Sequence, residues 1–168
     1  MSQVYALRIT ATGLAKYAAA QLADAAVRLS DVAVGDGGGA PIAIAGDETA
    51  LYGQVGAPHP VIAVAGVDGH PTWIKVTVQI PAEAGGFTMR EVGIYDDEAD
   101  LIAIGAYPEQ YKPALAEGFG EDLLLDLIFA YVNAGEVITE SAGSSIYPTV
   151  EYLERRLSEN NTWYWKQA

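Results

Sequence analysis

The sequence of 168 residues contains no cysteine. That absence excludes both a disulfide framework and a thiolate metal site. Basic residues are also few, because nine Lys and Arg stand against 22 Asp and Glu, and the formal net charge is −13. Binding to nucleic acid needs clustered Lys and Arg. We therefore expect no nucleic-acid partner, and a basic or polar partner surface instead.

Long apolar runs are missing as well. No stretch of about 18 apolar residues without charges occurs, so no membrane insertion is expected. The amino terminus, Met1–Tyr5, lacks a basic region followed by an apolar core, which argues against a secretory signal. Synthesis in a bacterial cytoplasm fits this pattern. The 51% hydrophobic and 18% charged residues are typical of a globular chain, which at this length buries about 70% of its extended surface.

Catalytic and metal-binding motifs are equally scarce. The two histidines, His59 and His70, lie among Pro and Gly without HxH or HxxxH spacing, so we expect turn or surface histidines. The run Gly35–Gly39 does not open a helix and is not followed by Lys-Ser or Lys-Thr, which favours a turn with positive φ angles over a phosphate site. No serine lies in a Gly-x-Ser-x-Gly elbow. We expect no enzyme, no cofactor and no metal site.

Charged residues gather at one predicted turn. The segment from Asp96 to Asp100 is rich in carboxylates but lacks the glycine and terminal Glu of a calcium loop, so a solvated hairpin tip is expected. The neighbouring Arg90 and Glu91 are candidates for an ion pair, either structural or exposed and of little weight.

The apolar pattern predicts mainly β-structure. Two strand-like runs within residues 85–113 flank the acidic turn and indicate a hairpin. A second hairpin is predicted from residues 61–67 and 72–80, where Ile74, Val76, Val78 and Ile80 alternate with polar residues around an Asp-Gly turn. Further strands are expected at residues 4–10, 27–34 and 137–139, and a loop at residues 40–60. Residues 121–132 fit a strand buried on both faces or at a subunit contact, with a helix as the competing interpretation.

Two helices are predicted, one near each end. Thr12 is placed to cap a helix that runs to about Asp24. Its sheet-facing side is expected to carry Leu14, Tyr17, Ala18 and Leu22.

At the other end, Thr149 precedes a helix with an apolar stripe of Val150, Leu153 and Leu157. This helix either docks on the domain or begins a trimeric stalk. The aromatic tail Trp163, Tyr164 and Trp165 follows it, as a contact surface or folded back onto its own domain.

The predicted fold class is α+β: a mainly antiparallel β-sheet or sandwich domain with an amino-terminal and a carboxy-terminal helix. We divide the chain into a domain of residues 1–143 and a segment of residues 144–168 that carries the second helix and the aromatic tail.

Several of these segments together carry a family resemblance. They are residues 33–39, Ile80-Pro81 with 85–87, 89–97, 101–103 and 111–118. In order and spacing the chain resembles, over about residues 5–155, the amino-terminal domain of phage tail-collar fibre proteins. The resemblance implies a non-enzymatic protein of the virion tail that attaches a homotrimeric fibre to the baseplate or tail tip, while the distal part of the fibre meets the host receptor.

Members of this family usually continue into a long shaft, whereas this sequence stops at Ala168. The resulting hypothesis is an adaptor or a shortened fibre. Its candidate assembly interface, toward trimer mates or a separate distal fibre chain, consists of Val150, Leu153, Leu157, Trp163, Tyr164 and Trp165. The alternative is a receptor- or glycan-binding module that uses Trp73, Trp163 and Trp165.

Overall fold

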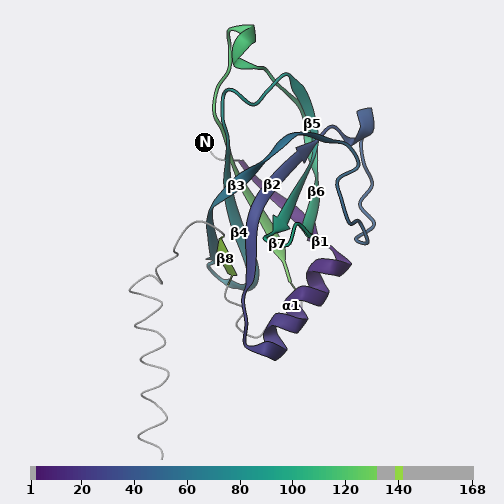
Figure 1. Cartoon of the computed structure of the whole chain (residues 1–168), viewed down its shortest axis with the longest axis vertical. Coiled ribbons are helices and arrows are strands. Elements are labelled where there is room, and N and C mark those ends of the chain that lie inside the picture. Colours follow the sequence, from purple (N-terminus) through teal and green to yellow (C-terminus); the bar gives the residue numbers. More distant parts are fainter. Residues whose placement is uncertain (1–2, 132–138, 142–168) are drawn as a thin grey trace, which may run out of the picture.

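A computed structural model describes residues 3–131 and 139–141 of the chain, and its centre is a β-barrel (Figure 1). The barrel strands are β1 (Gln3–Ile9), β2 (Val27–Gly35), β3 (Gln54–Val67), β4 (His70–Ile80), β5 (Phe87–Asp96), β6 (Leu101–Lys112) and β7 (Leu123–Ala130). The other described elements are helix α1 (Ala11–Ala23), the 3₁₀ turns η1 (Gly37–Gly39) and η2 (Leu115–Glu117), and the short strand β8 (Thr139–Ser141).

The strands follow the order β3-β4-β7-β1-β6-β5-β2, and β2 pairs again with β3. This last pairing closes the sheet, so the predicted sandwich is wrong. Register shifts within the β2–β3 and β2–β5 pairs mark bulges that bend β2, and such bends help a sheet to curl. Pairing is antiparallel except for β1 with β7 and β2 with β8.

Both predicted hairpins are confirmed, as β3–β4 and β5–β6. The alternating residues of β4, from Ile74 to Ile80, are buried as expected. The loop predicted for residues 40–60 is too long, because β3 begins at Gln54 and contains Pro58 and Pro60. These prolines precede Val61, where pairing with β4 begins. Proline is accepted where a strand has a partner on only one side, because no ladder hydrogen bond is lost.

The run ambiguous between strand and helix is strand β7. Only its inward residues Leu125, Leu127 and Phe129 are buried, whereas Leu124 is 46% exposed. Burial on both faces is therefore wrong, because each strand of a barrel turns one face to the interior and one outward. The short strand expected at residues 137–139 is found as β8 at Thr139–Ser141, parallel to the start of β2.

Helix α1 is capped by Thr10 instead of Thr12. The Thr10 hydroxyl accepts a hydrogen bond from the Gly13 amide at 3.0 Å and donates to the Leu101 carbonyl oxygen at 2.6 Å. One side chain thus both starts the helix and fixes it to β6. The carboxyl end was predicted correctly, since Asp24 is the C-cap with a φ of 51°.

The predicted helix face is largely wrong. The buried residues are Gly13, Tyr17 and Ala20, while Leu22 is 92% exposed and Leu14 is 40% exposed. Tyr17 stacks on the ring of Tyr131 with centroids 5.1 Å apart. Small residues on either side of Tyr17 let the helix approach the sheet closely, which two leucines on that face would prevent.

Among residues 3–131 and 139–141, no helix is both long and apolar enough to cross a membrane. The predicted carboxy-terminal helix and aromatic tail, within residues 144–168, lie outside the described residues.

Replacing Gly13 by Ala should destabilise the protein by about 1–3 kcal/mol, the usual range for overpacking. A β-carbon at this position would collide with the Ile102 carbonyl oxygen, which is backbone and cannot rotate away. Urea unfolding measures the loss. The control Leu22→Ala removes a 92% exposed side chain and should change stability by less than about 0.5 kcal/mol. Equal effects of the two substitutions would contradict this packing.

Candidate functional site

Two connections meet at the end of the barrel where β4 and β6 finish and β5 and β7 begin. We call residues 81–86 and 113–122 the apex; it includes η2, the uppermost element in Figure 1. Lys112, the last residue of β6, is only 4% exposed. Its ammonium group donates to the carbonyl oxygens of Pro81 at 2.9 Å and Glu121 at 3.1 Å. One buried cation thereby joins both parts of the apex through charge-assisted hydrogen bonds.

Close backbone contacts hold the same two segments together. A β-carbon on Gly85 would collide with the Pro113 carbonyl oxygen, so only glycine fits there. The Asp122 carboxylate accepts the Ala82 amide at 2.8 Å, and the Gly86 amide donates to the Lys112 carbonyl oxygen at 2.7 Å. The apex is thus a defined structure on a rigid barrel.

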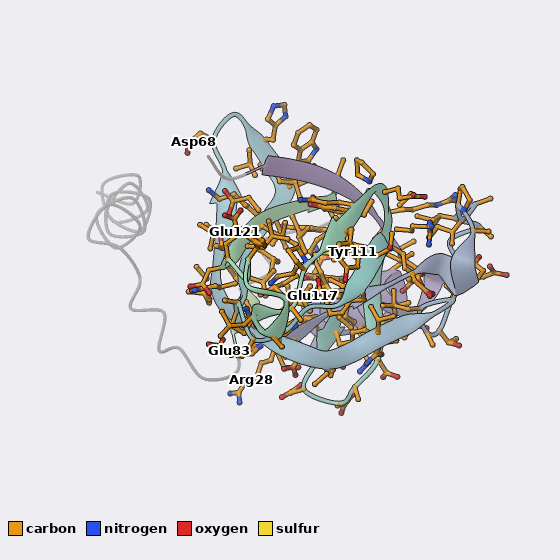
Figure 2. All side chains as sticks on the ribbon, turned by 90° about the horizontal axis from the view of Figure 1, so that it is seen from above. Arg28, Asp68, Glu83, Tyr111, Glu117 and Glu121 are labelled. Carbon is orange, nitrogen blue, oxygen red and sulfur yellow. The ribbon has the colours of Figure 1, made fainter. Side chains whose placement is uncertain are left out.

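The outer surface of the apex combines apolar and acidic side chains. Leu115 and Phe119 are 50% and 82% exposed, and Tyr111, beside the apex at the end of β6, is 52% exposed. The exposed acidic residues of the apex are Glu83, Glu117, Glu121 and Asp122. Figure 2 looks down on this end, with Glu83, Tyr111, Glu117 and Glu121 labelled. The Tyr111 hydroxyl donates to the Glu117 carboxylate at 2.8 Å, and this hydrogen bond raises the pKa of Tyr111.

A buried carboxylate organises the neighbouring connection between β2 and β3. Glu91 on β5 is 0% exposed. One of its oxygens accepts the Gly53 amide at 2.6 Å and the Gly37 amide at 3.3 Å, and the other accepts the Tyr52 amide at 3.0 Å. The positive φ angles at Gly37, Gly38 and Gly39 confirm the predicted turn.

The predicted Arg90–Glu91 ion pair is wrong, because successive residues of a strand point to opposite faces. Arg90 instead pairs with Glu109 at 2.9 Å and donates to the Asp36 carbonyl oxygen at 3.1 Å. Both residues therefore brace the same connection, from opposite sides of β5.

His59 lies in strand β3, opposite Val32 of β2, and is only 9% exposed. The expectation of a turn or surface residue is wrong for His59, because β3 begins earlier than predicted. Burial, and then the charge of nearby Lys112, hold the pKa of His59 below its ordinary value. The depressed pKa of His59 is therefore a consequence of its buried position near Lys112.

At the opposite end, the acidic hairpin tip is matched by Lys16 of α1. The Lys16 ammonium lies 2.5 Å from Asp96, 2.5 Å from Glu98 and 2.6 Å from Asp100. The tip is solvated as expected at Glu98, which is 74% exposed, but Asp96 is an exception at only 4%. Burial lowers the pKa of Lys16, but the three carboxylates outweigh that effect and raise it.

Ligand oxygens of Asp96, Glu98 and Asp100 lie within 4.8 Å of one another, as a metal site would need. The ammonium of Lys16 contacts all three, so the protein supplies its own cation. These ion pairs hold helix α1 against the β5–β6 hairpin.

The second histidine and the tryptophan considered for sugar binding lie together on β4. The rings of His70 and Trp73 stack with centroids 3.9 Å apart. His70 is exposed, as expected, and Trp73 is 38% exposed. One face of the indole is therefore covered by the imidazole, which leaves less of it for stacking on a sugar.

The structure brings together apex residues that the sequence did not single out as a site. Their signal was available in the run Tyr111–Gly118, whose polar and apolar residues follow no strand or helix period. The predicted assembly residues Val150, Leu153, Leu157, Trp163, Tyr164 and Trp165 lie outside the described residues.

Comparison with known proteins agrees with the sequence resemblance. Residues 1–152 match the family described as "Phage tail-collar fibre protein, N-terminal". The chain is 35% identical over 162 residues to the "Probable tail fiber protein" of Escherichia phage P2, an alignment that covers 95% of this chain and 24% of the relative. The chain thus spans about a quarter of the length of that curated relative. No solved structure matches this chain.

Replacing Glu91 by Gln should destabilise the protein by about 1–3 kcal/mol, the usual effect of leaving a buried hydrogen-bonding group without its partner. In either orientation the new amide NH₂ would face a backbone N–H that now donates to the carboxylate. Urea unfolding measures the loss, and hydrogen exchange should accelerate at the amides of Tyr52 and Gly53. Glu83→Gln, on an exposed residue away from this connection, serves as the control. Unchanged exchange in the Glu91 variant would rule out this anchoring role.

Stability should fall as the pH is lowered below about 6.5, the pKa of an unfolded histidine, because the folded-state pKa of His59 is depressed. Above that pH His59 is neutral in both states and its contribution is complete. Below it the unfolded chain binds the proton first and is favoured.

Urea midpoints at several pH values between 5 and 8 test this expectation. His59→Gln should flatten the pH dependence in this window, and His70→Gln, which changes the exposed histidine, should leave it intact. A wild-type slope retained in the His59 variant would assign the effect to other groups.

Proposed function

This chain belongs to the phage tail-collar fibre protein family, and we propose on that premise that it attaches a tail fibre to the baseplate of the phage tail. Members of this family are structural proteins of phage tail fibres. The observation that carries the proposal is the match of residues 1–152 to the amino-terminal part of these proteins. An attachment point at the amino-terminal end leaves the remainder of a fibre to reach outward.

The described domain is suited to carrying mechanical load. A closed barrel has no free edge along which strands separate easily, and inward side chains such as Leu29, Ile94 and Phe129 fill its interior. Buried or partly buried charged groups fasten the connections at both ends, through Glu91 and Lys112 at one end and Lys16 at the other. These features support a passive joint with a fixed shape.

Three partners follow from this proposal. The domain meets a baseplate or tail-tip protein, associates with two further copies of itself, and joins the host-recognition part of the fibre, on the same or a separate chain. The apolar stripe of Val150, Leu153 and Leu157 supports the trimer, because apolar residues at spacings of three and four favour helix association.

Binding to tails that lack fibres tests the attachment. The purified full chain should co-sediment with fibreless tails and decorate the baseplate in electron micrographs. An unrelated acidic protein of similar size serves as the control. If the chain did not bind such tails but blocked adsorption of intact phage to host cells, the receptor- or glycan-binding alternative would replace this proposal.

Replacing Val150, Leu153 and Leu157 together by Asp should abolish trimer formation, because three charges per helix would then meet in the apolar seam. Light scattering measures the oligomeric state, and circular dichroism should show that the β-domain still folds. Substituting Glu151, Glu154 and Glu159 by Gln, on the same segment, provides a matched control that should remain trimeric. A trimer that survived the Asp substitutions would exclude this stripe as the joint.

A further inference from the structure

We propose that the apex is the docking surface of the domain, and that its partner is a tail protein presenting an apolar pocket bordered by Lys and Arg. This inference rests on the proposed function and specifies the surface and the partner chemistry for it. It follows from three observations: the exposed apolar side chains, the fixed backbone that carries them, and the acidic residues among them.

The first observation is a concentration of exposed apolar side chains. Leu115 and Phe119 lie in the connection between β6 and β7, next to Tyr111 at the end of β6, and Phe119 is 82% exposed. The other large exposed apolar residues of the described chain are spread over α1, the β2–β3 connection, β3, β4 and β7, as Leu22 and Ile62 illustrate. Scattered apolar residues are ordinary on a protein surface, but a gathered group rimmed by polar residues marks a contact site.

The second observation is that the backbone beneath these side chains is already fixed. Lys112 ties the two segments of the apex to each other. The η2 turn ends at Gly118, which has a φ of 91°. This left-handed residue, favourable for glycine, redirects the chain immediately before Phe119. A preorganised loop loses little conformational entropy on binding, so its exposed aromatic residue can act as an anchor for a partner pocket.

The third observation decides which partner fits. Exposed Glu83, Glu117, Glu121 and Asp122 share the apex with the apolar residues, and the whole chain carries a net charge of −13. Two copies of the apex facing each other would bring like charges together, as would an anionic membrane or nucleic acid. A pocket lined by Lys and Arg would instead attract this rim, steering the encounter and fixing its orientation.

The experiment compares binding of the full chain, wild type and variants, to fibreless tails. Phe119→Ser and Leu115→Ser together should weaken binding by about thirtyfold or more, as expected for loss of a central anchor. Ile62→Ser, on a β3 residue that is 46% exposed, is the matched control and should bind as wild type. Unchanged melting temperatures show that both variants fold.

A second pair of variants tests the charge rim. Glu83→Gln with Glu121→Gln should lower the affinity and reduce its dependence on salt between about 50 and 300 mM, where screening changes most. Asp68 lies in the turn between β3 and β4, far from the apex. The control Asp68→Asn should therefore leave the affinity and its salt dependence unchanged.

The outcomes separate the two proposals. If wild type binds the tails and the Phe119–Leu115 variant binds equally well, the apex inference is overturned while the attachment function stands. Binding that strengthens when Glu83 and Glu121 are neutralised would overturn the basic-rimmed partner. If wild type fails to bind, the attachment function itself is overturned, and the partner named here falls with it.

Discussion

The fold depends on strand β2, which hydrogen-bonds to β5 along most of its length and to β3 through its second half. That double pairing closes the sheet and leaves β8 beside only the first residues of β2. Closure also separates the connections into two ends. Helix α1 and the acidic turn share one end with the short β3–β4 turn, while the two connections of the apex lie at the other (Figure 1). The apex and the Lys16 cluster therefore lie at opposite ends of the barrel.

Buried or half-buried charges fasten each end, and they do so through different chemistry. Lys16 meets three carboxylates, which lie on another element of the same chain. Glu91 and Lys112 instead bond to backbone groups, the first to amides and the second to carbonyls. A charge satisfied by backbone fixes the path of a connection regardless of the neighbouring side chains. The backbone of these connections therefore does not depend on their exposed side chains, which can vary to suit a partner.

Structural features that arise from neighbouring segments could be predicted from the sequence. Features that arise from pairing between distant segments could not. The β3–β4 hairpin followed from a period-two pattern, and the β5–β6 hairpin from two strand-like runs on either side of a short acidic turn, since neighbouring strands need only a short turn. Closure did not, because the contact between β2 and β3 spans a long irregular connection. The helix face failed for a related reason: Gly13 is buried because β6 approaches closely at Ile102, whereas hydrophobicity alone favours Leu14 and Leu22. The acidic turn was recognised, but its partner Lys16 comes from 80 residues earlier.

The apex was missed as a site because its parts are meaningful only in combination. Lys112 looks like an ordinary surface lysine in the sequence, yet its burial turns it into the internal support for Phe119 and the acidic residues around it. Residues 111–118 belong to the segments that carry the family resemblance, but the resemblance does not distinguish residues needed for folding from residues that contact a partner. The structure separates the two roles by residue. Lys112 is buried and Gly85 packs against the Pro113 carbonyl, so both hold the backbone, whereas Leu115 and Phe119 are 50% and 82% exposed and present the surface that a partner would contact.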